Sequence, residues 1–262
     1  FAAYAEGVID LFELKRRTLS LTNRRPMRLT MHNGVTSLTD FTLRGAQSFI
    51  EVKGHDFTRD RLNVRLDGKV NLRLLQIFVP FLEEFSGQAN IGVDIAGKVE
   101  TPDILGTATV ENGYVKVKGF PHPFQRIHSD IEFSQSKILI NAFNGTLAGG
   151  IFSGDGTIEL AGIRNIPVNI KAHLDNVSLN VPDKVHTNGS GDLTFSGNWF
   201  PYTLAGTYHV SSGLMDMELT DGTSTNKLKQ SSYLPKVILQ SAFEPLVLDI
   251  NVILDNPLQV KN

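Results

Sequence analysis

Alternation of apolar and polar residues runs through most of this chain and constrains its fold more than any other feature. Side chains two residues apart fall on the same face of a β-strand, so the alternation predicts strands with one apolar and one polar face. The clearest segments are 61–66 (RLNVRL), 89–95 (ANIGVDI), 127–133 (IHSDIEF), 168–175 (VNIKAHLD) and 246–254 (LVLDINVIL). A chain built from such segments is predicted to be almost all β.

Asn-Gly and Asp-Gly pairs lie between the alternating segments and favour the positive φ angles of tight hairpin turns. The first residues of these pairs are Asn33, Asp67, Asn112, Asn144, Asp155, Asn188 and Asp221. We interpret them as the turns of a long antiparallel meander.

Two short segments depart from the period of two. Residues 8–15 (VIDLFELK) and 72–85 (LRLLQIFVPFLEEF) group apolar residues at three- and four-residue spacing, which is typical of a helix, and Pro80 would kink or restart the second. The second helix is either ordinary core packing, which we favour, or a cap or plug over an open end of the sheet. The plug residues would be Leu75, Phe78, Phe81, Leu82 and Phe85. Residues 220–236 are polar and predict a loose loop.

One pattern of glycines occurs twice. Residues 97–117 (GKVETPDILGTATVENGYVKV) and 197–217 (GNWFPYTLAGTYHVSSGLMDM) both space glycines by nine and then seven residues, with Pro in the first interval. A shared unit of Pro turn, strand, turn glycine and strand is a better explanation than chance among 23 glycines. Trp199, Phe200 and Tyr202 precede the second repeat strand. They are either a lipid or partner contact or, as we favour, a turn packed on the sheet edge.

Strands with one apolar face need something to cover that face. A second sheet would do so in a sandwich, whereas a sheet folded into a trough would be covered partly by itself and partly by an apolar ligand. Hydrophobic residues make up 41% of the chain and charged residues 20%, which is enough for a real core. The net charge of −2 gives no reason to expect nucleic acid as a partner.

Cysteine is absent, which excludes disulfides and thiolate metal sites. No run approaches the roughly 20 apolar residues that span a bilayer, and the N-terminus (FAAYAEGVID) lacks the basic start and apolar run of a secretory signal. The chain does not begin with Met. We therefore expect residues 1–262 to be one continuous segment excised from a longer protein, whose targeting or anchoring segment lies elsewhere.

Candidate reactive residues do not form a recognisable site. The histidines are His32, His55, His122, His128, His173, His186 and His209. Zinc ligands usually come as close pairs on one element, and only His122 and His128 lie near each other, so we interpret them as surface residues. The glycine-rich run 145–156 lacks the phosphate-binding patterns, and carboxylates are scattered on outward faces or turns. We predict no catalytic residues, no metal, no cofactor and no enzyme activity.

Six segments, in their order along the chain, resemble the C-terminal half of the TamB family, within the wider AsmA-like family of diderm envelope proteins. They are 69–75 (KVNLRLL), 80–87 (PFLEEFSG), 97–106 (GKVETPDILG), 110–119 (VENGYVKVKG), 145–156 (GTLAGGIFSGDG) and 203–213 (TLAGTYHVSSG). The ending 256–262 (NPLQVKN) resembles the lead-in to a further repeat.

This resemblance implies an elongated, U-shaped antiparallel sheet, often called a β-taco, with an apolar channel along its length. It also implies the periplasm of a diderm bacterium, an inner-membrane anchor upstream and an outer-membrane Omp85-type (TamA-like) partner downstream. The family is tied to phospholipid transport across the periplasm and, in an older interpretation, to assembly of outer-membrane proteins.

Three functions stay open from the sequence. A lipid conduit would hold phospholipid acyl chains in the groove, because hydrocarbon gains roughly 0.8 kcal/mol per buried CH₂. A scaffold or chaperone would offer sheet edges by β-augmentation, and an extracellular passenger or adhesin would have a filled core. An open dry trough favours the first, a long unprotected edge the second and a filled interior the third. The residues predicted to face the groove are Ile91, Val93, Ile95, Ile131, Phe133, Ile170, Leu174, Phe195, Leu248, Ile250 and Val252.

Overall fold

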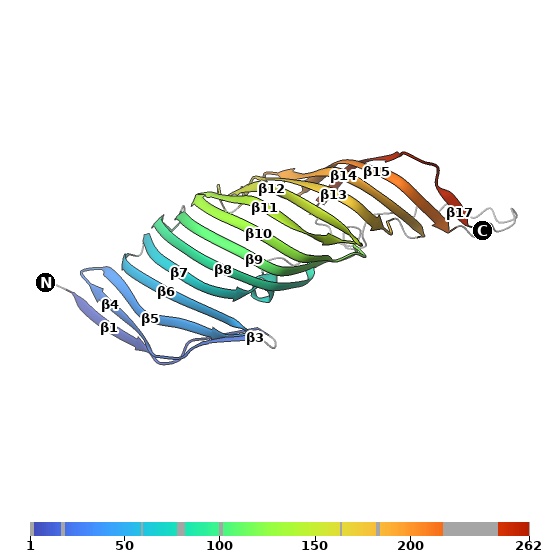
Figure 1. The fold of residues 1–262 in the computed structure, drawn as a ribbon. Coiled ribbons are helices and arrows are strands. Elements are labelled where there is room, and N and C mark those ends of the chain that lie inside the picture. The colour runs from blue at the N-terminus through green and yellow to red at the C-terminus, as the bar shows by residue number, and fades with distance from the viewer. Residues whose placement is uncertain are drawn as a thin grey trace, which may run out of the picture.

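One large curled but unclosed sheet makes up almost all of the described molecule (Figure 1). The computed structural model describes residues 3–16, 19–58, 60–77, 82–99, 102–162, 164–181, 184–216 and 246–261. The strands lie side by side, oblique to the long axis, and the two chain ends lie at opposite ends of the molecule (Figure 1). The prediction of an elongated all-β molecule is confirmed.

Within the described residues, seventeen strands and one short 3₁₀ helix follow one another. Their bounds are β1 Tyr4–Ile9, β2 Glu13–Arg16, β3 Leu19–Asn23, β4 Met27–His32, β5 Val35–Gly45, β6 Ser48–Phe57, β7 Arg61–Asn71, η1 Leu72–Ile77, β8 Leu82–Lys98, β9 Pro102–Val117, β10 Phe124–Gln135, β11 Lys137–Leu147, β12 Gly150–Glu159, β13 Val168–Leu179, β14 Val185–Gly197, β15 Tyr202–Asp216, β16 Leu246–Leu254 and β17 Gln259–Lys261.

The sheet is an antiparallel meander through its middle. From β5 to β15 each strand pairs antiparallel with the next one along the chain. At the N-terminal end, β1 pairs with β4 and β2 pairs with β3. At the C-terminal end, β16 and β17 instead run parallel to β15. A parallel partner needs a crossover of a dozen or more residues, and residues 217–245 are long enough to provide it.

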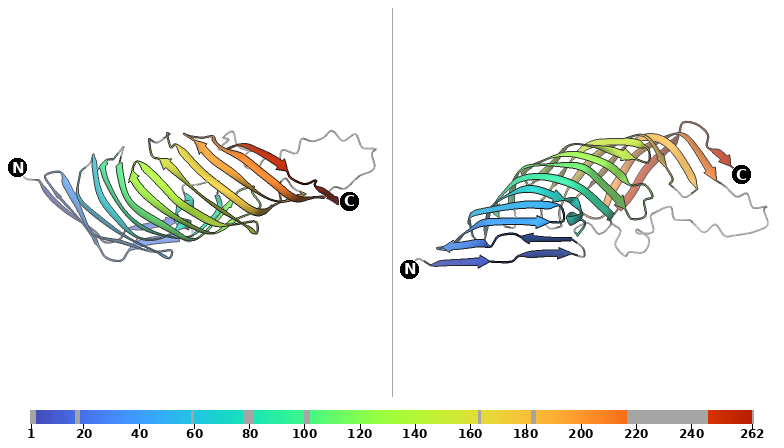
Figure 2. Two further views of the ribbon diagram at one scale, coloured as in Figure 1. Left: turned by 45° about the horizontal axis from the view of Figure 1, so that its top comes forward. Right: turned by 60° about the horizontal axis from the view of Figure 1, so that its bottom comes forward.

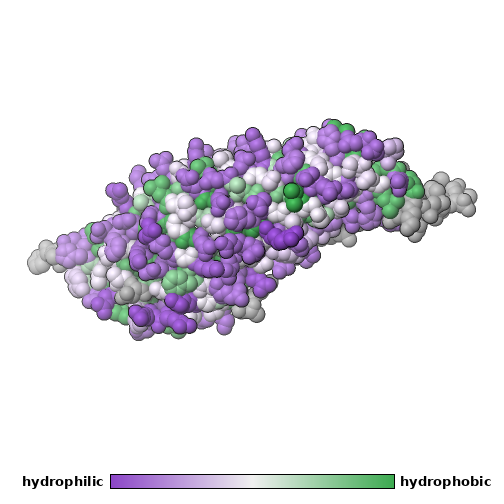
Figure 3. Space-filling model, viewed as in Figure 1, coloured by the Kyte–Doolittle hydropathy of each residue, from purple (hydrophilic) through white to green (hydrophobic). Residues whose placement is uncertain are grey.

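The curled sheet has a concave and a convex side (Figure 2), and its two faces differ in burial. Val93 in β8 and Leu174 in β13 are only 5% and 6% exposed, whereas Asp94 and Lys171, on the opposite face of the same strands, are exposed. A single curled sheet buries side chains on its concave side, so we call the face of Val93 and Leu174 the inner face. The side of the molecule drawn in Figure 3 is mostly hydrophilic, with small hydrophobic areas.

Most Asn-Gly and Asp-Gly pairs are not turns, so that prediction is wrong for five of the seven. Asn33-Gly34 does form the β4–β5 turn, with φ of 53° and 81°. The pairs that lie inside strands begin at Asp67, Asn112, Asn144, Asp155 and Asn188, and Asp221 lies outside the described residues. Their glycines meet close neighbours: a Cβ on Gly145 would stand 2.7 Å from the ring of Phe152. Close approach inside the sheet, and not hairpin geometry, explains these glycines.

The predicted helix at 8–15 is wrong, and the one at 72–85 is wrong for residues 82–85, whereas residues 78–81 lie outside the described residues. Residues 8–9 end β1 and residues 13–15 belong to β2, because their backbones pair with β4 and β3 and this pairing overrides the local helical spacing. The 3₁₀ helix η1 ends at Ile77, and β8 begins at Leu82. The predicted loop 220–236 lies outside the described residues.

The two glycine repeats fold alike, as predicted. In each unit the strand after the Pro carries the second glycine: Gly106 in β9 and Gly206 in β15, with φ of 143° and 147°. A Cβ on Gly106 would strike the carbonyl of Gly92 in the preceding strand, and one on Gly206 would strike the carbonyl of Asp192. The repeat therefore encodes the same close strand pair at two places in the sheet.

Candidate functional site

An unbroken apolar row crosses the inner face from β5 to β16. Its members are direct partners from one strand to the next, so their side chains lie on the same face. We call it the central row: Leu43, Ile50, Gly68, Ile91, Ala108, Ile131, Ile140, Gly156, Ile170, Phe195, Leu204 and Leu248. No member of the central row carries a polar side chain.

Two further rows flank the central row. The row on one side, from β5 to β14, is Phe41, Val52, Leu66, Val93, Gly106, Phe133, Ile138, Ile158, Val168 and Gly197. The row on the other side, from β7 to β16, is Val70, Ala89, Val110, Ser129, Phe143, Gly154, Ala172, Leu193, Gly206 and Ile250. The Ser129 hydroxyl is its single polar group and is satisfied by donating to the Ala142 carbonyl at 3.1 Å. Three adjacent rows thus form a wide apolar surface.

The central row is accessible along much of its length. Ile91, Ile131, Ile170 and Phe195 are half-buried, although they sit at the middle of a large sheet. At the C-terminal edge, Leu248 is 39% exposed. An apolar surface that is continuous and only half-covered can bind hydrocarbon, since burying it further would release its hydration water.

Aromatic rings lie over glycines of neighbouring strands on this face. Besides Phe152 over Gly145, the ring of Tyr208 lies 3.0 Å from where a Cβ of Gly189 would be. The ring fills the space that the missing side chain leaves, as in the aromatic rescue of strand glycines. The sequence analysis missed these residues, because the pairs become visible only when the strand register is known.

Both long rims of the sheet carry aromatic clusters in its C-terminal half. At one rim, Phe124 stands edge-on to Phe152 with ring centroids 5.3 Å apart. At the other rim, Phe200 and Tyr202 have centroids 5.1 Å apart, and the Tyr202 hydroxyl donates to the Ile166 carbonyl at 3.0 Å. Trp199 and Phe200 connect β14 to β15 and are half-buried. Their packing agrees with a turn packed on the sheet edge.

Charged groups pair with one another on the outer face. The Arg65 guanidinium donates to Asp67 at 2.7 Å and to Asp94 at 2.8 Å, which raises the pKa of Arg65. His173 lies 2.8 Å from Asp192 in the next strand. Exposed pairs of this kind tie neighbouring strands together and each contribute little stability. Within the described ranges, no three His, Cys, Asp or Glu side chains gather as metal ligands would.

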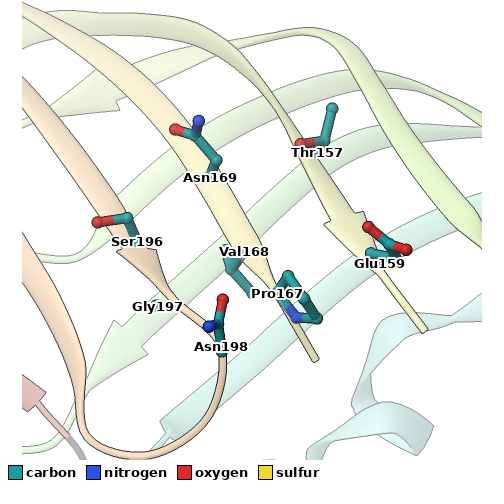
Figure 4. A pocket seen from close by; sticks show the side chains of 8 residues that line it. All are labelled: Thr157, Glu159, Pro167, Val168, Asn169, Ser196, Gly197 and Asn198. Carbon is teal, nitrogen blue, oxygen red and sulfur yellow. The ribbon is translucent and has the colours of Figure 1, made fainter. Parts of the chain in front are cut away.

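Two small hollows are lined mostly by polar residues, and the first also touches Val168 and Gly197 of a flanking row. The first, of about 300 Å³, is lined by Thr157, Glu159, Pro167, Val168, Asn169, Ser196, Gly197 and Asn198 at one end of β12–β14 (Figure 4). Thr157, Asn169 and Ser196 are cross-strand partners that alternate with inner-face residues, so their side chains belong to the outer face. The second, of about 490 Å³, is lined by Tyr4, Thr30, His32, Asn33, Val35, Ser37 and Asp56. Neither resembles a reaction centre.

The strand register places all the residues predicted for the groove on the inner face. In the central row are Ile91, Ile131, Ile170, Phe195 and Leu248; in the flanking rows are Val93, Phe133 and Ile250. Ile95 pairs with Ile104, Leu174 with Phe152 and Val252 with Tyr208. Their contact with lipid stays a prediction.

The residues predicted as a plug do not form one helix. Leu75 belongs to η1, whereas Leu82 and Phe85 belong to β8 and pair with Val117 and Val115 of β9. Phe78 and Phe81 lie outside the described residues. Since Leu82 and Phe85 extend the sheet, they cannot act as part of a helical cap.

Comparison with known proteins agrees with this architecture. Residues 141–262, which contain most of β11 and all later strands, match the family model of the TamB C-terminal domain. This segment is similar to the TamB C-terminal domain. The match confirms the resemblance to the TamB family, and the strands before residue 141 continue the same sheet.

The TamB family works with membrane components of the cell envelope and is not a known enzyme family, so the match indicates an envelope-associated protein. No match was found among curated proteins or among solved structures. In the part of the chain that the structure describes, no helix is both long and apolar enough to cross a membrane.

Proposed function

We propose that this segment shields phospholipid acyl chains on its apolar inner face while they pass between the inner and outer membranes. The observation that carries the proposal is the central row, which continues without a polar side chain from β5 to β16. With strands about 4.8 Å apart, this path is roughly 50 Å long. Each CH₂ that leaves water for such a surface gains about 0.8 kcal/mol.

In this proposal the segment is part of a periplasmic bridge in a diderm bacterium. An inner-membrane anchor upstream and an Omp85-type (TamA-like) outer-membrane partner downstream would connect its two ends. Acyl chains would lie along the rows and headgroups would stay at the open rim, where water can solvate them. No chemical step is required of the protein, so its role is to lower the free energy of hydrocarbon outside a membrane.

A second candidate function is a scaffold for outer-membrane protein strands. It is favoured by β16, in which Val247, Val252 and Leu254 are 43%, 56% and 52% exposed. Among the described strands, β16 pairs only with β15, so one of its edges offers backbone groups for β-augmentation. This function depends on edge hydrogen bonds and does not need a continuous apolar path.

Crosslinking tests the lipid proposal with a matched control. A photo-crosslinking residue is placed at Ile91 or Ile170, and in the control at the adjacent Asn90 or Asn169, which are exposed on the outer face. The full-length protein is reconstituted in phosphatidylethanolamine vesicles and irradiated. Crosslinkers on the inner face should capture phospholipid, and crosslinkers on the outer face should not. Equal capture on both faces would mean nonspecific adsorption and would contradict the proposal.

A charge in the central row tests passage of lipid. Ile170→Asp puts a carboxylate in the path, which costs several kcal/mol against hydrocarbon, whereas Asn169→Asp puts the same charge on the outer face of the same strand. Ile170→Asp should slow lipid transfer by the full-length protein at least tenfold, and Asn169→Asp should not. Circular dichroism confirms folding. Normal transfer by folded Ile170→Asp would exclude the conduit and favour the scaffold.

A further inference from the structure

The connection between β9 and β10 reaches across one rim of the sheet. His122, in this connection, accepts a hydrogen bond through Nε2 from the backbone N–H of Asn180 at 2.8 Å. Asn180 follows β13, so the bond joins two connections that are 58 residues apart and have the β11–β12 turn between them. The side-chain oxygen of Asn180 also lies 2.7 Å from Nδ1 of His186. Residues 118–123 are therefore latched to a distant part of the same rim.

The latched connection covers apolar inner-face residues. The Phe120 ring is stacked on Phe124 with centroids 5.9 Å apart and stands edge-on to the His122 ring at 5.7 Å. Phe120 and Phe124 both pack against the buried cluster that contains Leu147 and Val177, which are 3% and 0% exposed. At this rim the apolar residues Leu147 and Val177 are buried, in contrast with the half-buried central row.

We propose that residues 118–123 form a strap that closes this rim of the apolar face and that opens when His122 takes up a proton. Opening would expose apolar surface next to the rows that we propose to hold lipid. As a control of lipid access the strap rests on the proposed function, but its latch and its opening do not depend on lipid.

The chemistry of the latch gives the direction of the pH effect. A ring nitrogen that accepts a hydrogen bond has no proton, and protonated histidine has two N–H donors and no acceptor, so protonation of His122 breaks the bond to Asn180. Burial lowers the pKa of His122 below its ordinary value, which keeps the ring neutral near pH 7. The latch is therefore intact at pH 7 and is lost as the pH falls through the lowered pKa of His122.

Other charged groups near the strap do not reverse this direction. Lys118 lies in the strap, Lys184 directly precedes β14 and His186 lies in β14, whereas the lowered pKa of His122 is caused by burial. Asp183 lies outside the described residues. No ion pair to His122 occurs in the described part of the chain.

Hydrogen exchange of the Asn180 amide measures the latch directly. The whole chain is followed by NMR from pH 7.5 to pH 5, with exchange corrected for its intrinsic pH dependence. The protection of the Asn180 amide should fall roughly tenfold or more, with the same midpoint as the titration of the His122 ring. An apolar dye should bind more strongly over the same range. His122→Gln keeps an acceptor that does not titrate, so it should remove the transition, whereas His173→Gln on the outer face should leave it unchanged.

Two results would overturn the strap. One is Asn180 protection that does not change with pH in the wild-type protein. The other is a transition that is the same in His122→Gln, which would assign it to another group. Lipid capture at Ile170 is measured separately. If the strap opens but no lipid is captured, the proposed function is rejected and the strap is retained. If lipid is captured but the strap does not open, the strap is rejected and the proposed function is retained.

Discussion

The ring of Phe152 in β12 occupies the place where a side chain of Gly145 in β11 would lie. The two residues are direct cross-strand partners, and a Cβ on Gly145 would stand 2.7 Å from two ring carbons. The glycine allows a large ring to lie flat against the sheet and not stand away from it. At this position the inner face is therefore apolar while its aromatic ring lies close against the neighbouring strand.

Adding one methyl group at Gly145 should destabilise the sheet. Gly145→Ala would force the Phe152 ring and the Gln125 carbonyl, 2.8 Å from the new Cβ, to move, and we expect a loss of about 1–3 kcal/mol in the free energy of unfolding. Urea denaturation followed by circular dichroism measures it. The control is Gly7→Ala in β1, where nothing lies within 4 Å, and the expected change is within about 0.5 kcal/mol. Equal effects would show that ring contact is not the cause.

Asn23 should be essential for the stability of the N-terminal strands. Its side chain is buried, accepts from the Phe12 N–H at 2.6 Å and donates to the carbonyls of Asp10 and Arg25 at 3.2 and 3.0 Å. Asn23→Ala leaves these groups unpaired and should cost about 1–3 kcal/mol. Asn23→Asp keeps the acceptor but places a carboxylate beside the carbonyls, so it should be at least as harmful at pH 7. Unchanged proteolysis of residues 3–32 in both variants would contradict this role.

Tyr208 should make the C-terminal half sensitive to alkali. Its hydroxyl donates to the Val177 carbonyl at 3.1 Å, and burial raises the pKa of Tyr208. A raised pKa in the folded state means that its contribution to stability is complete below about pH 10 and is lost as the pH rises through the folded-state value. Tyr208→Phe should lower stability at pH 7 by about 1 kcal/mol and should flatten the alkaline decline. The same decline in both proteins would assign it to other groups.

The elongated shape should be visible in solution. A compact chain of this length has a radius of gyration of about 18 Å, and a single row of strands should exceed that clearly. Small-angle scattering with size-exclusion chromatography measures the radius on a monomeric sample. A value near 18 Å would contradict an open sheet.

Much of the inner face could be predicted from the sequence. Period-two alternation at residues 89–95 and 168–175 places Ile91 and Ile170 on the apolar side, because strand geometry fixes that side whatever the neighbouring strand is. The polar side, with Asn90 and Asn169, follows in the same way. What alternation does not contain is register, so the continuity of the central row appears only in the structure.

The failures of sequence reasoning have a common cause. The glycine after Asn144 has the same local sequence as a hairpin turn, but it serves the ring of Phe152, which belongs to another strand. Residues 8–15 have helical spacing, yet backbone pairing with β3 and β4 makes them strands. The strap could not be predicted from the sequence, because His122 was considered only as a metal ligand and its hydrogen-bond partner Asn180 is 58 residues away. In each case a distant residue determines the outcome.

The two glycine repeats have a consequence for how such a protein can change in length. In a meander, each strand pair shares backbone hydrogen bonds only with its neighbours, as repeats do in a solenoid. A duplicated pair such as β8–β9 or β14–β15 could be inserted between existing pairs without rebuilding a shared core, and each would lengthen the sheet by about 10 Å. The length of the sheet can then change in small, uniform increments by gene duplication, with the apolar path extended at every step.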